Sequence, residues 1–182
     1  AEYAHRFANV TTEPIYRATV AQMIGTAYAD AVLQMYPVSD YASPRAAMVQ
    51  VMSDRNITCT ARKIARLVSA VQVEPVYRYH FRRILSAPER HADGAYHASE
   101  LLYVFQHMDG VYFAANDDDR AVESNLLNYW TRFAANGDPN AANMPAWSEY
   151  DPIADPYQIL DVVPAGDVLL KDDKCSFWDS LT

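Results

Sequence analysis

The sequence predicts an α/β fold that is rich in helices and has a few strands of an incomplete central sheet. Several long segments repeat apolar residues at three- and four-residue steps, which is the spacing of amphipathic helices. Residues 76–81, 157–162 and 168–171 are instead rich in β-branched and aromatic side chains, as strands are. These strands are too few and too far apart along the chain to complete a sheet. No internal repeat or shift in composition marks a second domain, so residues 1–182 are expected to form one domain.

The first part of the chain is expected to be helical. Residues 12–36 repeat apolar side chains at helical spacing, with Thr12 as the expected N-cap and Pro37 as the stop. A shorter helix covers residues 44–52, and Asp54 is expected to cap the helix after it. The apolar face of that third helix is Ile57, Ala61, Ile64, Ala65 and Val68. Its basic side chains are expected to form a solvated face: Arg55, Arg62, Lys63 and Arg66.

The second part mixes strands with helices. Residues 76–81 are apolar on both sides, as in a strand buried on both faces, and such a strand needs neighbours that this chain barely supplies. A polar loop over residues 86–95 leads to a short helix from about Ala98. Three aspartates at residues 117–119 begin another helix, which Gly137 closes. These aspartates are expected to form a solvated helix start. A calcium site is the alternative, and their spacing does not suit a calcium-binding loop. A last helix begins at Cys175.

Composition excludes several classes of function. The formal net charge of −8 and the pI of about 5.0 argue against a nucleic-acid partner, which needs clustered Lys and Arg. Five glycines are too few, and too widely spaced, for a phosphate-binding glycine loop or a Gly-x-Ser-x-Gly elbow in this chain. No apolar run reaches the length of a membrane span. The start of the chain lacks both an initiator Met and a signal-peptide pattern, so we expect a processed chain or a fragment.

Residues 94–105 form the strongest local motif, Gly-Ala-Tyr-His-Ala-Ser-Glu-Leu-Leu-Tyr-Val-Phe. This segment resembles the Gly-x-x-His-x-x-Glu-[Leu/Ile]-x-x-[Val/Ile]-Phe motif of the type-B carboxylesterase and cholinesterase family. Further segments similar to that family follow in the right order: residues 54–59, 75–81, 129–140, 147–150 and 174–178. The resemblance runs from about residue 36 to the end. It implies the C-terminal portion of an α/β-hydrolase fold, in a carboxylesterase domain whose N-terminal part is absent.

The resemblance implies that His97 is the general base of a serine esterase that acts on small-molecule esters. Histidine suits this role because its unperturbed pKa of about 6.5 lets it accept and donate a proton near neutral pH. The triad order in such hydrolases is Ser, then Asp or Glu, then His. The serine and the acid are therefore expected before Ala1, in the N-terminal part of the same enzyme, and this chain alone is expected to be inactive. Glu2 is not expected to be the acid, because the family's glycine is missing beside it.

Glu100 has two open interpretations. The resemblance implies a buried glutamate that braces the loop of His97. The alternative is an ordinary acid in the first turn of a helix, stabilised by the helix dipole. A set of aromatic residues also has two interpretations: its members line part of a substrate pocket, or they belong to the hydrophobic core. The set is Tyr96, Tyr103, Phe105, Tyr112 and Phe113. No cofactor is expected, and no metal site, because His91 and His97 lack a ligand-spaced cysteine or carboxylate cluster.

Cys59 and Cys175 match family cysteines that pair with each other, so the resemblance implies a disulfide. Two buried free thiols are the alternative. A disulfide implies an oxidising compartment, so we expect a secreted or periplasmic protein.

Two other functions remain open from the sequence. Non-catalytic relatives in this family serve in adhesion or binding, and a replaced serine upstream would place this protein among them. An independent binding module is the other, although the incomplete sheet argues against it.

Overall fold

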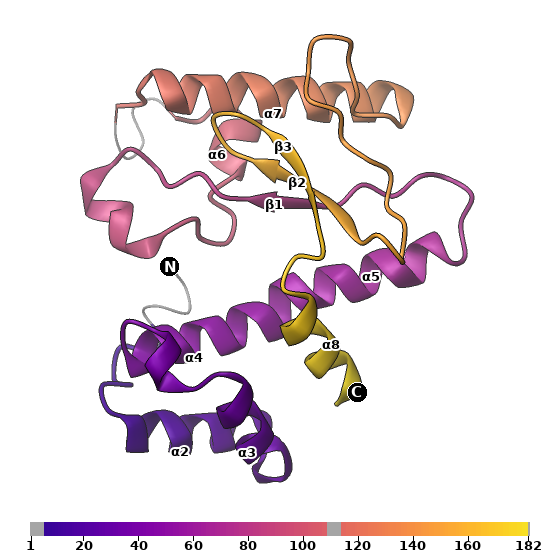
Figure 1. The fold of residues 1–182 in the computed structure, drawn as a ribbon. Coiled ribbons are helices and arrows are strands. Elements are labelled where there is room, and N and C mark those ends of the chain that lie inside the picture. Colours follow the sequence, from indigo (N-terminus) through magenta and orange to yellow (C-terminus); the bar gives the residue numbers. More distant parts are fainter. Residues whose placement is uncertain (1–5, 109–113, 182) are drawn as a thin grey trace. The chain divides into compact units, whose positions relative to one another are not determined.

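The computed structural model describes residues 6–108 and 114–181 (Figure 1). These residues divide into two compact units, described here one at a time. The first runs up to residue 63 and takes in residue 171 onwards, and the second covers residues 64–170. The predicted class is confirmed, because helices dominate and one small mixed sheet is present. That the whole chain is one domain stays a prediction.

Helices build the first unit. They are α2 (Glu13–Ile24), α3 (Thr26–Met35), α4 (Pro44–Ser53), the start of α5 (Cys59–Ser69) and α8 (Asp172–Ser180), with a 3₁₀ turn η1 (Val38–Asp40) and a π-helical segment η2 (Asp54–Thr58). The residues of α5 from 64 onwards belong to the second unit. The Thr12 hydroxyl accepts a hydrogen bond from the Ile15 amide at 3.5 Å, which confirms Thr12 as the N-cap. The chain leaves α3 at Tyr36, directly before Pro37, as predicted.

The single helix expected over residues 12–36 is interrupted at Gly25. Gly25 has φ 101° and ψ 144°, so α2 ends there and α3 starts at the next residue. The apolar periodicity continues across the break and therefore hides it from the sequence. Glycine allows the break, because this region of backbone conformation is nearly closed to other residues.

Gly25→Ala is expected to lower the free energy of unfolding by about 1–3 kcal/mol, the usual cost of such a conformation in a residue with a Cβ. No atom lies within 4 Å of an added Cβ, so the loss would come from the backbone alone. Urea unfolding measures it, with the exposed neighbour Thr26→Ala as control. Equal stability of the two variants would show that the Gly25 conformation is not required.

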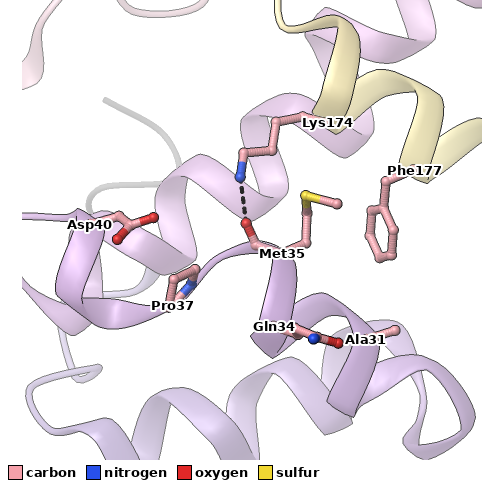
Figure 2. A pocket seen from close by; sticks show the side chains of 7 residues that line it. All are labelled: Ala31, Gln34, Met35, Pro37, Asp40, Lys174 and Phe177. Carbon is pink, nitrogen blue, oxygen red and sulfur yellow. Dashed lines mark hydrogen bonds between the residues drawn. The ribbon is translucent and has the colours of Figure 1, made fainter.

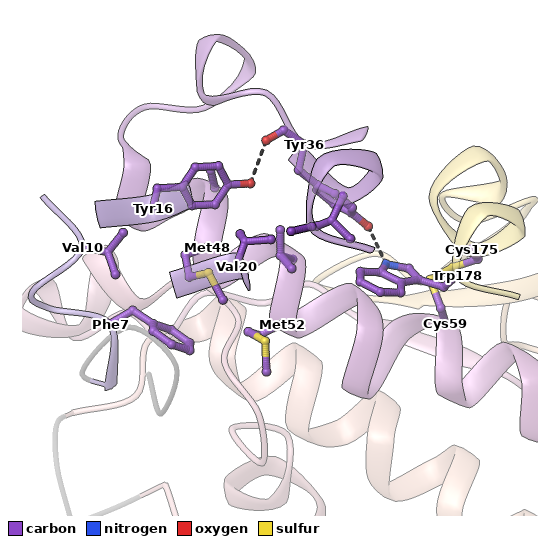
Figure 3. Close-up of a cluster of buried hydrophobic side chains, with 14 residues drawn as sticks. Phe7, Val10, Tyr16, Val20, Tyr36, Met48, Met52, Cys59, Cys175 and Trp178 are labelled. Atoms are coloured by element: carbon purple, nitrogen blue, oxygen red, sulfur yellow. Dashed lines mark hydrogen bonds between the residues drawn. A yellow bond between two sulfur atoms is a disulfide. The ribbon is translucent and has the colours of Figure 1, made fainter. Parts of the chain in front are cut away.

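A tyrosine-centred core fills the first unit (Figure 3). The Tyr16 hydroxyl donates to the Tyr36 carbonyl at 2.8 Å, and the Trp178 indole donates to the Tyr36 hydroxyl at 2.8 Å. The predicted disulfide between Cys59 and Cys175 is present and joins α5 to α8 beside this core. Helix α8 is thus held to the unit by a covalent bond, a buried hydrogen bond and apolar packing.

Two predictions about residues 54–69 were wrong. Asp54 is not an N-cap, because the chain continues from α4 through η2 into α5 without leaving the helix. Its buried carboxylate instead accepts hydrogen bonds from Gln50 at 2.8 Å, from Tyr36 at 3.3 Å and from Lys171. Arg62 is fully buried rather than solvated, and its guanidinium pairs with two carboxylates of α8, Asp172 at 2.7 Å and Asp179 at 2.8 Å.

The burial of Arg62 and the exposure of two isoleucines change the expected faces of this helix in part. Ile57 and Ile64 are 42% and 54% exposed, whereas Arg62 and Ala65 are buried. A buried guanidinium is tolerated where carboxylates balance its charge and accept its donors.

The second unit contains the sheet. Its elements are β1 (Tyr79–Phe81), η3 (Pro88–Asp93), α6 (Leu101–Val104), α7 (Asp117–Asn136), β2 (Pro156–Leu160) and β3 (Ala165–Val168). The strand order is β1-β2-β3, with β1 parallel and β3 antiparallel to the central β2. Helix α7 runs alongside the sheet, and its Val122 and Leu126 pack with Phe81 of β1 and Leu160 of β2 (Figure 1). Gly137 ends α7 in a left-handed conformation, as predicted.

Strand β1 is shorter than the six residues expected, and it is paired on one side by β2. Within the part of the chain that the structure describes, no strand pairs with its other edge. The sheet is therefore incomplete, as predicted, and β1 has a free edge at which further strands would fit.

Candidate active site

His97 lies on the turn that leads into α6, and its side chain is exposed. Gly94 before it has φ 64° and Ala98 after it has φ 67°, so the chain turns through left-handed conformations on both sides of the histidine. Glycine adopts this conformation readily, but Ala98 is strained there, and such strain gathers at functional sites. Among the described residues none hydrogen-bonds the His97 imidazole. The ring is therefore exposed on the surface of the unit and does not pack in its core.

Glu100 lies on the turn after His97, near the Tyr79 hydroxyl of strand β1. Burial, followed by the nearby charge of Glu100, raises the pKa of Tyr79 to about 12, so Tyr79 stays protonated at neutral pH. Glu100 is half-buried, and its side chain makes no capping hydrogen bond to α6. Both interpretations of Glu100, as a brace and as an ordinary first-turn acid, stay predictions.

Asp119 is a buried acid that the sequence did not single out. Its carboxylate accepts hydrogen bonds from the Arg83 Nε at 2.8 Å, from the Tyr103 hydroxyl at 3.0 Å and from the Ser86 hydroxyl. Burial on its own would raise the pKa of Asp119, but the hydrogen bonds from Ser86, Arg83, the Asn116 backbone and Tyr103 together hold that pKa below its ordinary value. The carboxylate is therefore ionised at neutral pH, and its neighbours stabilise that charge.

The prediction that residues 117–119 are all solvated was accordingly wrong for Asp119, while Asp117 and Asp118 are exposed. A signal was available in the spacing of Asn116 and Asp119. This Asn-x-x-Asp pair forms a capping box, in which Asn116 accepts from the Asp119 amide at 2.9 Å and Asp119 accepts from the Asn116 amide at 3.2 Å. The box singles out the third of the three aspartates.

The aromatic set that the sequence left open between pocket lining and core is described at three of its five positions. Tyr103 is buried in the core, Tyr96 is partly buried and Phe105 is 63% exposed. Tyr112 and Phe113 lie outside the described residues. Aromatic side chains and one proline line a different cavity, of about 160 Å³, beside β1 and α7: Tyr77, Tyr79, Tyr129, Trp130, Phe133, Pro139 and Trp147. Tyr79, one of these lining residues, lies near Glu100.

A larger cavity of about 430 Å³ belongs to the first unit (Figure 2). It lies between α3 and α8, and charged Asp40 and Lys174 face it together with apolar Met35 and Phe177. The Lys174 ammonium donates to the Met35 carbonyl and lies 4.7 Å from the Tyr36 ring centroid. Neither His97 nor Glu100 lines this cavity.

The described residues contain no group of three His, Cys, Asp or Glu able to hold a metal ion. In the same part of the chain, none of the helices has the length and apolar character needed to cross a bilayer.

Comparison with known proteins identifies a family. The sequence profile of the Carboxylesterase family matches residues 3–178. Carboxylesterase 4A from Bos taurus is 30% identical over 112 residues, which are 59% of this chain and 20% of that protein. Cocaine esterase from Homo sapiens is 26% identical over 166 residues, which are 86% of this chain and 28% of that protein.

A third relative, "Fatty acyl-CoA hydrolase precursor, medium chain" from Anas platyrhynchos, is 32% identical over 115 residues, or 59% of this chain and 20% of that protein. The chain thus spans only 20–28% of the length of these three curated relatives.

Proposed function

The chain belongs to the carboxylesterase family, and on that premise we propose that it supplies the general-base histidine, His97, of a serine carboxylesterase. The observation that carries the proposal is the placement of His97. Its exposed imidazole stands on a strained turn, within the segment that resembles the family's histidine motif. Glu100, near the Tyr79 hydroxyl of β1, is proposed to brace that turn.

The proposed reaction uses His97 twice. In acylation His97 takes the proton of a serine hydroxyl while the serine oxygen attacks the ester carbonyl, and it returns that proton to the departing alcohol. In deacylation His97 takes a proton from water, whose oxygen attacks the acyl-enzyme, and returns it to the serine as the carboxylic acid leaves. The third member of the triad, a carboxylate, holds the imidazole in the tautomer whose nitrogen facing the serine can accept a proton. Neither the serine elbow nor that carboxylate is assigned to this chain.

The remaining parts of the active site are proposed to come from the N-terminal part of the same enzyme. Two observations support this partner. The relatives extend far beyond the matched region. Among the described residues, the unit that holds His97 also has a strand edge without a partner and exposed apolar side chains. Ile84, Leu101 and Phe105 are 45%, 46% and 63% exposed. Isolated apolar side chains are common on surfaces, but together with an open sheet edge they fit a surface that more of the fold covers.

The proposed substrate is a small-molecule ester with a small or medium acyl or aryl group. The names of the relatives support hydrolysis of acyl compounds, since two are esterases and one is an acyl-CoA hydrolase. The disulfide and the word precursor in one relative's name support a secreted or periplasmic site of action.

Hydrolysis of p-nitrophenyl acetate by two proteins tests the proposal. The isolated 182-residue chain is expected to show no turnover above buffer, and the complete enzyme that contains it is expected to turn over. Turnover by the isolated chain that His97→Ala removes would place the nucleophile within these residues and contradict the proposed division. A complete protein without turnover would instead support the non-catalytic adhesion or binding function.

A further inference from the structure

The segment that carries His97 is anchored at both ends on one buried carboxylate. Ser86 lies eleven residues before His97 and Tyr103 lies six residues after it. Both hydroxyls donate to Asp119, Ser86 to Oδ2 and Tyr103 to Oδ1 at 3.0 Å. One side chain on α7 therefore closes the whole loop that presents the histidine.

Both oxygens of the Asp119 carboxylate accept two hydrogen bonds each. Oδ1 accepts from Arg83 as well as from Tyr103, and Oδ2 accepts from the Asn116 amide as well as from Ser86. Arg83 supplies the opposite charge at 2.8 Å and also donates to the Asn116 side chain at 3.2 Å. Such a network of charge-assisted bonds inside a protein is rigid, because breaking one bond leaves a buried polar group unpaired.

Local hydrogen bonds shape the turn between the two anchors. The Ser99 hydroxyl donates to the Tyr96 carbonyl at 2.7 Å, and the Leu101 amide donates to the Ala98 carbonyl at 3.2 Å. Ala87, Tyr96 and Leu102 also pack in the core cluster that contains Val122 and Leu126 of α7. The hydrogen bonds of Ser86 and Tyr103 to Asp119 add a directional, charge-assisted constraint to this apolar packing.

We infer that Asp119 is a positioning residue for His97, acting through Ser86 and Tyr103 and without touching the substrate. This inference rests on the proposed function of His97. Asp119 holds the ends of the loop so that the imidazole meets the serine in the reactive geometry. A loosened loop leaves substrate binding intact and lowers the rate of the chemical step, because general-base catalysis depends steeply on alignment.

Tyr103→Phe in the complete enzyme is the sharpest test, because it removes one hydroxyl from the Asp119 network and keeps the aromatic ring in the core. The expected result is a fall in kcat of about 10- to 100-fold with KM unchanged, the scale of a small misplacement of reacting groups. Tyr129→Phe is the matched control. Tyr129 is equally buried, and its hydroxyl donates to the Pro145 carbonyl at 2.7 Å and accepts from the Gln158 amide at 3.3 Å, both outside the His97 loop. Its kcat is expected to stay within about twofold, since the reacting geometry is untouched.

Asp119→Asn provides a second measurement, which does not depend on activity. Amide hydrogen exchange of residues 94–100 in the 182-residue chain is expected to rise in Asp119→Asn and Tyr103→Phe and to stay unchanged in Tyr129→Phe. Unchanged exchange, or equal loss of kcat in Tyr103→Phe and Tyr129→Phe, would overturn the positioning role. If exchange rises but His97→Ala leaves activity intact, the proposed function fails while the anchoring by Asp119 stands.

Discussion

His97→Ala in the complete enzyme is expected to lower kcat/KM for p-nitrophenyl acetate by at least about 10²–10⁴-fold, the usual contribution of a general base. The loss follows because no other group would remove the serine proton during attack. The main effect should fall on kcat, since the imidazole interacts with the reacting atoms rather than with bound substrate. Steady-state kinetics of the purified variant measure both constants.

His91→Ala is the matched control for that substitution. His91 is exposed like His97 and lies in η3 of the same loop between β1 and α6, but outside the motif. Its activity is expected to equal that of the wild type. Similar losses in the two variants would mean that the loop tolerates no change, and an active His97→Ala enzyme would remove His97 from the mechanism.

Removal of the Cys59–Cys175 disulfide should produce the largest change in stability. The two cysteines are 116 residues apart in sequence, and in the chain-entropy model a crosslink over such a long loop contributes about 4–5 kcal/mol. The double variant Cys59→Ala, Cys175→Ala is expected to lose that free energy of unfolding, because the unfolded chain gains conformations that the crosslink forbids. Urea unfolding of the variant and the oxidised wild type measures the difference.

Reductant supplies the control for the disulfide. Reduced wild type should approach the double variant in stability, whereas the variant itself should not respond. Mass measurement after alkylation should find no free thiol in the unreduced wild type. Two alkylated cysteines there, or a double variant as stable as the oxidised protein, would contradict a stabilising crosslink.

Local signals predicted much of the fold. Thr12 and Gly137 were located correctly because capping depends on a residue's own side chain and backbone. The strands around residues 79–81 and 156–160 were found from their β-branched and aromatic content. Gly25 was missed because one glycine in an amphipathic pattern is compatible with either a continuous or a broken helix.

Residues whose role depends on distant partners were not predictable in the same way. Arg62 was assigned to a solvated face because its two carboxylate partners lie more than a hundred residues later in the sequence. Asp119 was grouped with two exposed aspartates because Arg83, Ser86 and Tyr103 meet it only in the folded unit.

His97 was predicted from the resemblance to a family, and the structure then showed the conformation and contacts of the segment around it. The motif around His97 came from a resemblance that the family match supports, but its strained turn, the nearness of Glu100 to Tyr79 and its anchor at Asp119 required the structure. The histidine turn is therefore more firmly held than the sequence implied, although the imidazole itself is exposed.

Addition of imidazole to the His97→Ala enzyme is the most direct test of His97 as the general base. His97→Ala removes the imidazole ring, so free imidazole can occupy the space that the ring leaves in the active site. Hydrolysis of p-nitrophenyl acetate by His97→Ala is expected to rise with imidazole concentration, beyond the rate of imidazole in buffer, while wild type and His91→Ala do not respond. A His97→Ala enzyme that keeps full activity without imidazole would contradict the assignment.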